Sequence, residues 1–416
     1  RPGPWVDVVH MVLSLLARAE ERLFNAGLAF FYKHRSNTPT LKLTQQDVTD
    51  AKGFSIHMVR VDDGMASSGT PLVLLHGYAS GTGMFHTALP FLAESWPGPV
   101  FALDSPGCGL SDRPSWTQGS STDCALDDAE GFWVERVDGW RRAMGIDKMV
   151  LCGHSVGGYM AVAYTERHPH AVERLILVSP VGVPRPPENL AERRKDAPLL
   201  FRLALRAWEA GWGPFPIIRF GSLGQSLAGI SESLDGATIG PGKFLMRRYA
   251  ERRFANYPWV EKEAIASYFY SNLAHADGSW GAVAHSLLLV PGAFARSPLC
   301  HRIPRLGSDG SSNVGRWISF IYGDRDWMDP SHAEALKEGE GAADEKCVPM
   351  AGSTAVPRIE VARVAGAGHN IPIDNPLGFA EAVLASAGRS TNAAFDGRTF
   401  GADHILALAP VDLDDK

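Results

Sequence analysis

The chain has 416 residues, of which 45% are hydrophobic, so it can bury one extended core together with an inserted domain. Its formal net charge of −6 argues against nucleic acid as a partner. No metal-ligand spacing or glycine-rich phosphate loop is present, so we expect no metal and no cofactor. The five cysteines are odd in number and scattered, which favours reduced thiols over disulfides: Cys108, Cys124, Cys152, Cys300 and Cys347.

The first 50 residues are assigned to an N-terminal amphipathic helical segment. Apolar residues recur at helical spacing and are followed by an aromatic group: Val8, Val9, Val12, Leu15, Leu16, Ala19, Leu23, Phe24, Leu28, Phe30 and Phe31. Packing against the rest of the protein is the ordinary interpretation, and anchoring at a membrane–water interface is the alternative. No apolar run reaches the roughly 18 residues that cross a bilayer. The first residue is Arg1 rather than Met, which leaves room for an upstream targeting segment.

Strands and helices alternate through residues 51–184. Strands are predicted at 54–61, 71–75, 99–103 and 148–152, and helices at 127–144 and 159–167. Such alternation predicts an α/β fold, with a mostly parallel sheet that carries helices on both faces.

The strand at 148–152 runs into Gly153-His154-Ser155-Val156-Gly157, and a helix follows at once. A Gly-x-Ser-x-Gly sequence that follows a strand and precedes a helix is typical of a nucleophile elbow, which is a strained turn that exposes the serine hydroxyl. Side chains in place of the two glycines would collide with neighbouring backbone. A plain glycine-rich turn is the alternative for an isolated motif, but the flanking strand and helix favour a nucleophilic Ser155, with His154 supporting the turn.

The alternation stops in residues 185–304, which we assign to a helical cap. Helices are predicted at 199–210, 241–256 and 260–275. An apolar cluster from Trp208 to Phe220 either forms the core of this cap, lines an acyl-chain tunnel or touches a membrane. Four arginines on the second helix form either a solvated face or a contact for anionic headgroups: Arg247, Arg248, Arg252 and Arg253.

Residues 305–388 return to the strand pattern. An apolar run at 317–322 ends in a loop that carries three carboxylates. A buried carboxylate is needed beside a catalytic imidazole, because it orients the ring and stabilises its charged form. We choose Asp326, expect Asp324 to form the turn by bonding its own backbone, and keep Asp329 as a third candidate.

A second strand, at 359–364, opens into Gly366-Ala367-Gly368-His369. We predict that His369 is the general base, which takes the Ser155 proton and later returns it to the leaving group. An ordinary loop histidine is the alternative. The final residues, 389–416, lack periodicity and end acidic, so we expect a flexible acidic tail.

The strand at 71–75 ends in His76-Gly77-Tyr78. The backbone N–H groups of Tyr78 and Val156 are predicted to form an oxyanion hole, each contributing on the order of 3 kcal/mol to lowering the barrier. His76 and Gly77 are expected to brace this loop.

The order serine, aspartate, histidine, each after a strand, resembles that of the α/β-hydrolases. Within them the chain is similar to the lipid-acting subfamily of cardiolipin-specific deacylase and α/β-hydrolase domain-containing proteins 4 and 5, through residues 71–78, 101–114, 145–155, 174–180 and 366–369. This resemblance implies an eight-stranded sheet with a cap inserted after the sixth strand. One branch of the subfamily carries Asn at the elbow and activates lipases, whereas position 155 here is Ser.

The subfamily also carries a His-x4-Asp box linked to acyl transfer onto lysophospholipids, present here as His369 to Asp374. The residues themselves favour a different role, in which Asp374 caps the helix predicted at 376–387.

Together, these observations and the resemblance predict a serine hydrolase that cleaves a lipid ester, of a (lyso)phospholipid or cardiolipin, through an acyl-enzyme on Ser155. A lysophospholipid acyltransferase and a non-catalytic, lipid-binding lipase activator are the alternatives, and a proline-aminopeptidase-like peptidase is a more distant one. Epoxide hydrolases and dehalogenases carry Asp at the elbow. The expected location is intracellular and peripheral to a membrane, at the mitochondrion, the endoplasmic reticulum or lipid droplets.

Overall fold

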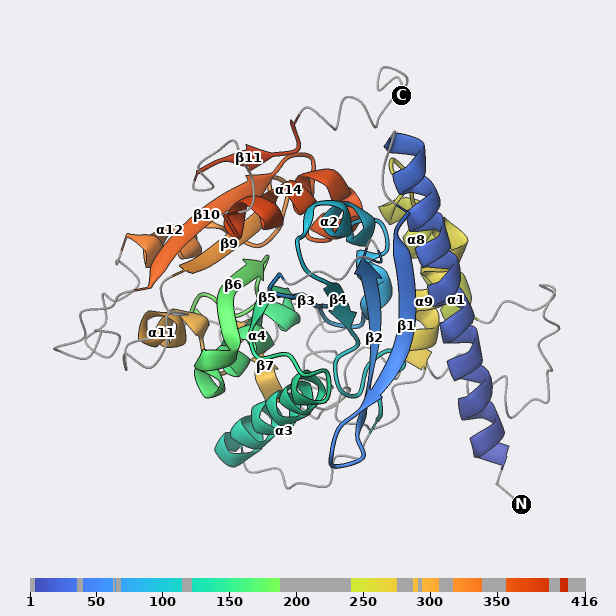
Figure 1. The fold of residues 1–416 in the computed structure, drawn as a ribbon, viewed down its shortest axis with the longest axis horizontal. Helices are drawn as coiled ribbons and strands as arrows, with labels where there is room; N and C mark the ends of the chain where they lie inside the picture. The colour runs from blue at the N-terminus through green and yellow to red at the C-terminus, as the bar shows by residue number, and fades with distance from the viewer. Residues whose placement is uncertain are drawn as a thin grey trace, which may run out of the picture.

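The structure is a computed structural model, and it describes residues 4–35, 40–62, 64, 69–113, 122–187, 241–274, 287–290, 294–306, 317–338, 357–388 and 397–402 (Figure 1). Within these residues, one sheet has the strand order β1-β2-β4-β3-β5-β6-β9-β10-β11. Its strands are Lys42–Thr49 (β1), Ser55–Asp62 (β2), Leu72–Leu75 (β3), Val100–Leu103 (β4), Met149–His154 (β5), Val172–Val178 (β6), Trp317–Gly323 (β9), Arg358–Val364 (β10) and Thr399–Phe400 (β11). A separate hairpin is formed by Leu289–Val290 (β7) and Phe294–Ala295 (β8).

The α-helices of the described residues are Pro4–His34 (α1), Leu89–Ser95 (α2), Thr122–Ala143 (α3), Val156–Arg167 (α4), Pro241–Arg253 (α8), Lys262–Ala274 (α9), Leu299–Arg302 (α11), Ser331–Lys337 (α12), Ile371–Asp374 (α13) and Pro376–Ser386 (α14). Short 3-10 helices lie at Thr82–Phe85 (η1), Pro169–Ala171 (η2) and Ile303–Arg305 (η3). Within the described part of the chain, no helix is both long enough and apolar enough to cross a membrane.

The sheet is parallel from β4 to β11, and β1 and β2 join it antiparallel at one edge. Alternate side chains of its central strands enter two different cores. In β3, Leu72 and Leu74 face the core that contains α1, α2, α9 and α14, whereas Val73 and Leu75 face the core that contains α3, α4 and α12 (Figure 1). Both faces are therefore covered by helices, which explains why these strands are apolar without interruption.

The sheet has one strand more than the eight predicted. The extra strand, β11, lies within the predicted tail 389–416, where Phe400 is buried and pairs with Val364 of β10. A two-residue strand has no periodicity, so the sequence could not indicate it. At the other edge, β1 forms within the 50 residues assigned to a helical segment.

The C-terminal half of helix α1 packs on the rest of the protein. Leu16, Leu23, Phe24 and Phe31 are buried, and they belong to the same core as the side chains of α9 and α14. The described side chains of α1 therefore favour the interpretation that this helix packs against the protein core over the alternative that it anchors at a membrane.

A group of ionisable residues, of which Glu20 and His57 are buried, fastens α1 to the sheet. Glu20 of α1 accepts hydrogen bonds from His57 Nε2 at 2.9 Å and from Thr82 Oγ1 at 2.6 Å. The other ring nitrogen of His57 lies 2.6 Å from Asp47 of β1. Burial alone would lower the pKa of His57, but the hydrogen bonds to Asp47 and Glu20 outweigh it and raise the pKa to about 10.

The insertion between β6 and β9 contains α8, α9, the β7–β8 hairpin and α11 in its described part. Helices α8 and α9 begin and end within a few residues of the ranges predicted for them. The apolar cluster from Trp208 to Phe220 and the helix predicted at 199–210 lie outside the described residues.

Candidate active site

Ser155 stands at the turn between β5 and α4, at the carboxyl edge of the sheet. Its backbone has φ 56° and ψ −116°, a conformation that a non-glycine residue adopts only under strain. The turn is tight enough that a Cβ atom on Gly157 would lie 2.5 Å from the carbonyl oxygen of Leu75, and one on Gly153 would lie 2.3 Å from that of Gly157. These glycines therefore let the backbone fold closely enough to hold Ser155 in its strained position.

Ser155, His369 and Asp326 form a hydrogen-bonded chain. His369 Nε2 lies 3.1 Å from Ser155 Oγ, and His369 Nδ1 lies 3.1 Å from Asp326 Oδ1. The carboxylate must accept, so Nδ1 donates to it and the unprotonated Nε2 accepts from the serine hydroxyl. Burial would raise the pKa of Asp326, but the hydrogen bond and charge of His369 lower it below its usual value. Asp326 is therefore an anion buried beside the imidazole.

The other two aspartates of the Asp326 loop are exposed to solvent. Asp324 is exposed and its backbone N–H donates to the carbonyl of Val364. Asp329 is also exposed and its side chain accepts from the backbone N–H of Ser331 at 2.9 Å, at the start of α12. Of the three candidates, the structure brings only Asp326 to His369.

The predicted oxyanion donors flank Ser155. Val156 is the first residue of α4, where amide N–H groups have no acceptor within the helix. Tyr78 follows Gly77 in the loop after β3, and a Cβ atom on Gly77 would lie 2.9 Å from Ser155 Cβ. The loop that carries the Tyr78 amide thus passes directly against the nucleophile elbow.

Two neutral histidines hold the loops around this chain. His76 Nδ1 donates to the carbonyl of Gly77, and its Nε2 accepts from the backbone N–H of Ser105. His154 Nε2 donates to the backbone carbonyl of His369 at 2.8 Å. Burial lowers the pKa of His76 to about 4 and that of His154 to about 3, so both rings are uncharged at neutral pH. The ring of His76 thus links the loop after β3 to the loop after β4, and the ring of His154 contacts the backbone of His369.

Asp374 does not cap the helix that follows it, so that prediction was wrong. The N-cap of α14 is Asn375, whose side chain accepts from the backbone N–H of Gly378. Asp374 is instead buried, and its two carboxylate oxygens accept hydrogen bonds from Nη2 of Arg253 in α8, at 2.8 Å (Oδ1) and 2.6 Å (Oδ2). Its Oδ2 also accepts from the backbone N–H of Gly368, the residue before His369. The neighbouring Asn375 is better placed to reach the first turn of the helix, which sequence reasoning overlooked.

Two residues beside the hydrogen-bonded chain were missed from the sequence. Ser179, directly after β6, donates its hydroxyl to Asp326 Oδ2. Trp327 is 63% exposed and its ring centroid lies 5.1 Å from that of His369. The position of Ser179 at the carboxyl end of a strand between β5 and β9 was an available signal, because such ends meet at one edge of the sheet.

One group of described residues brings three potential metal ligands within 4.8 Å of one another, namely Glu20, His57 and Asp104. A histidine binds a metal through an unprotonated nitrogen. Both nitrogens of His57 face carboxylates and its pKa is raised to about 10, so the ring is an imidazolium cation. In this structure His57 forms ion pairs with Glu20 and Asp47.

Replacing His57 with glutamine is expected to remove a pH-dependent part of the stability. The pKa of His57 is raised from 6.5 in the unfolded chain to about 10 in the folded protein, so protonation of this residue stabilises the fold. This stabilisation is complete below pH 6.5 and is lost as the pH rises through about 10. The free energy of unfolding, measured in urea, should therefore differ most between wild type and variant below pH 6.5. The difference should shrink toward pH 10, and a difference independent of pH would show that His57 is not charged in the fold.

The strand order and the serine at the strand–helix turn define the class as an α/β-hydrolase. A family model described as "alpha/beta hydrolase fold" matches residues 70–209. Among solved structures, the chain is similar to the epoxide hydrolase CorEH (TM-score 0.51, 19% identity, covering 83% of this chain and 99% of that one). It is also similar to a membrane phospholipase A described as a bacterial virulence factor (TM-score 0.50, 20% identity, covering 93% of each).

Several curated proteins resemble the chain more closely in sequence. The 1-acylglycerol-3-phosphate O-acyltransferase ABHD5 of Mus musculus is 30% identical, over 76% of this chain and 77% of the relative. The 1-acylglycerol-3-phosphate O-acyltransferase of Arabidopsis thaliana is 31% identical, over 84% and 73%. The (lyso)-N-acylphosphatidylethanolamine lipase of Homo sapiens is 30% identical, over 64% and 68%. The chain belongs to the α/β-hydrolase family that contains these proteins.

Proposed function

We propose that this protein hydrolyses carboxylic ester bonds of a lipid, of the (lyso)phospholipid or cardiolipin class, through an acyl-enzyme on Ser155. The observation that carries the proposal is the chain of two 3.1 Å contacts from Ser155 Oγ through His369 to Asp326. The lipid class is supported by the names of the relatives, which act on glycerophospholipids or on an N-acylated phospholipid.

In the proposed mechanism, Ser155 Oγ attacks the ester carbonyl while His369 Nε2 takes the hydroxyl proton. The oxyanion that forms accepts hydrogen bonds from the backbone N–H groups of Val156 and Tyr78. His369 then gives its proton to the leaving alcohol as the carbon–oxygen bond breaks. Water repeats the sequence on the acyl-enzyme, which releases the fatty acid and restores the serine. Asp326, ionised at neutral pH, stabilises the imidazolium in both steps.

Transfer of the acyl group to a lysophospholipid is the second candidate function. It is favoured by the acyltransferase names of the relatives, and it needs only that an alcohol replaces water in the second step. Asp374 of the His-x4-Asp box is engaged by Arg253 and Gly368, so the described contacts give it a role in holding the His369 loop. We therefore assign either reaction to Ser155 rather than to Asp374.

We further propose that the insertion between β6 and β9 covers the site as a cap, and that the protein meets its substrate at a lipid surface. The exposed Trp327 beside His369 suits the entrance for an acyl chain.

Incubation with a panel of phospholipids, lysophospholipids and cardiolipin, with and without a lysophospholipid acceptor, tests the proposal. We expect free fatty acid from at least one lipid, and its release should need Ser155. An acylated acceptor formed at the expense of fatty acid would favour the transferase. Lipid binding without either product would identify a non-catalytic lipid-binding protein and overturn the proposal.

A further inference from the structure

Helix α8 exposes an unusual share of large apolar side chains. In the part of the chain that the structure describes, five large hydrophobic residues are exposed, and three of them lie on this one helix: Phe244 (48%), Leu245 (51%) and Tyr249 (45%). A surface helix normally keeps such residues on its buried side, so this exposure needs a physical reason.

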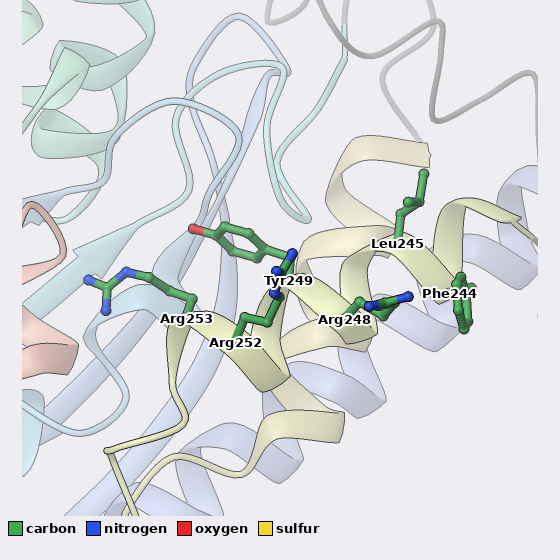
Figure 2. Close-up of a pocket in the computed structure, with 6 residues that line it drawn as sticks. All are labelled: Phe244, Leu245, Arg248, Tyr249, Arg252 and Arg253. Carbon is green, nitrogen blue, oxygen red and sulfur yellow. The ribbon is translucent and has the colours of Figure 1, made fainter. Parts of the chain in front are cut away.

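The buried side of α8 is already occupied. Ala250 and, just past the helix, Phe254 are fully buried in the same core as the side chains of α9. Phe244, Arg248 and Arg252 recur every four residues and form a stripe on the exposed side, beside Leu245 and Tyr249. These five residues, which we call the α8 outer face, line a surface pocket together with Arg253 (Figure 2).

The arginines of the outer face differ from their neighbour Arg247. Arg247 forms ion pairs with Glu251 at 3.0 Å and with Glu263 at 3.8 Å. For Arg248 and Arg252, the described residues provide no carboxylate within ion-pair distance, and the guanidinium of Arg248 lies 5.8 Å from the ring centre of Phe244. Within the described part of the chain, the outer face therefore combines two arginines that have no carboxylate partner with aromatic and aliphatic side chains.

The outer face is also tied to the candidate active site. Figure 2 shows Arg253, the last residue of α8, extending away from Phe244 and Leu245. Its guanidinium binds Asp374, which in turn accepts from the N–H of Gly368 beside His369. A surface that binds α8 is thus held at a fixed position relative to His369.

We propose that the α8 outer face docks onto the surface of a bilayer that contains anionic phospholipid. The apolar side chains would enter the boundary between headgroups and acyl chains, where tyrosine and phenylalanine are favourable, while Arg248 and Arg252 meet the phosphates. The charge and apolar groups are interleaved along one stripe, which matches a headgroup layer better than an acidic protein surface. The proposal rests on the proposed lipid hydrolysis only in that such an enzyme must reach its substrate in a membrane.

Co-sedimentation with vesicles tests the docking, and the Ser155→Ala protein is used so that hydrolysis cannot alter the lipid. Binding should be stronger to an equal mixture of phosphatidylcholine and phosphatidylglycerol than to phosphatidylcholine alone. Each arginine near an anionic surface raises the binding constant about fivefold, so Arg248→Ala/Arg252→Ala should bind the mixture roughly 20- to 30-fold less tightly. Phe244→Ala/Leu245→Ala should bind both vesicle types less tightly and keep the preference for the mixture.

A matched control removes two exposed positive charges elsewhere, by Lys52→Ala/Arg142→Ala, and should reduce binding much less. Equal binding to both vesicle types, or the same loss in the control as in Arg248→Ala/Arg252→Ala, would overturn the docking proposal. Turnover of a soluble short-chain ester by the wild type reports the proposed function separately. Ester turnover without vesicle binding would therefore contradict the docking proposal alone.

Discussion

Ser155→Ala should lower kcat for ester hydrolysis by about 10^4- to 10^6-fold, because the substitution removes the atom that forms the acyl-enzyme. The residual rate would come from the oxyanion amides and from substrate binding, which the substitution leaves in place. Ser155 is buried, and its hydroxyl contacts His369, so the change deletes one oxygen without creating a large cavity. Steady-state kinetics on the best lipid of the panel measure the effect.

The control for this variant is its thermal unfolding midpoint, which should stay close to that of the wild type. A variant that unfolds normally and keeps more than a few per cent of the turnover would mean that another group is the nucleophile. Retained lipid binding with lost turnover is the expected combination.

Asp326→Asn should lower kcat by roughly 10^3- to 10^4-fold, the second largest effect that we expect. An amide nitrogen can donate to His369 Nδ1, which would stabilise the tautomer with the proton on Nε2, where it cannot accept from Ser155. The asparagine would also fail to stabilise the imidazolium that forms during attack. The hydroxyl of Ser179, which donates to the carboxylate, would lose a charged acceptor.

Asp324→Asn is the matched control, because it makes the same chemical change two residues away on an exposed side chain. It should change kcat by less than about threefold, as expected for a surface position away from the reacting groups. Comparable losses in the two variants would contradict the assignment of Asp326 and would point to the loop as a whole. Both variants are compared by kcat and by the pH profile of kcat/KM.

The residues around the site could be predicted because each depends on a local pattern. The elbow needs glycines where the backbone of Gly157 meets that of Leu75, and this requirement shows directly in the Gly-x-Ser-x-Gly sequence. Asp326 and His369 follow apolar runs that form adjacent parallel strands, so their common position at one edge of the sheet follows from topology.

Other features depend on contacts between distant segments, which no short sequence pattern specifies. Strand β11 is only two residues long and exists through its pairing with β10. The role of Asp374 is set by Arg253, 121 positions away, and not by the helix that follows it. Ser179 reaches Asp326 across 147 positions, and its place at the end of β6 indicates the shared edge of the sheet but not this partner. The identity of such partners is decided by tertiary packing, which a pattern within a short window does not contain.

The choice among Asp324, Asp326 and Asp329 depends partly on a local sequence pattern and partly on tertiary packing. All three stand on one loop of polar residues, and turn chemistry alone allowed each of them to be the partner of His369. The structure separates them through burial, since the carboxylate of Asp326 is inaccessible to solvent whereas Asp324 and Asp329 are exposed.

Covalent labelling with a fluorophosphonate probe, followed by peptide mass spectrometry, tests the proposed nucleophile most directly. The reaction requires an activated serine and does not depend on knowing the natural lipid. We predict one adduct, on the peptide that contains Ser155, and no adduct at that position in Ser155→Ala. Modification of a different serine in an active wild-type protein, or no modification at all, would contradict the account.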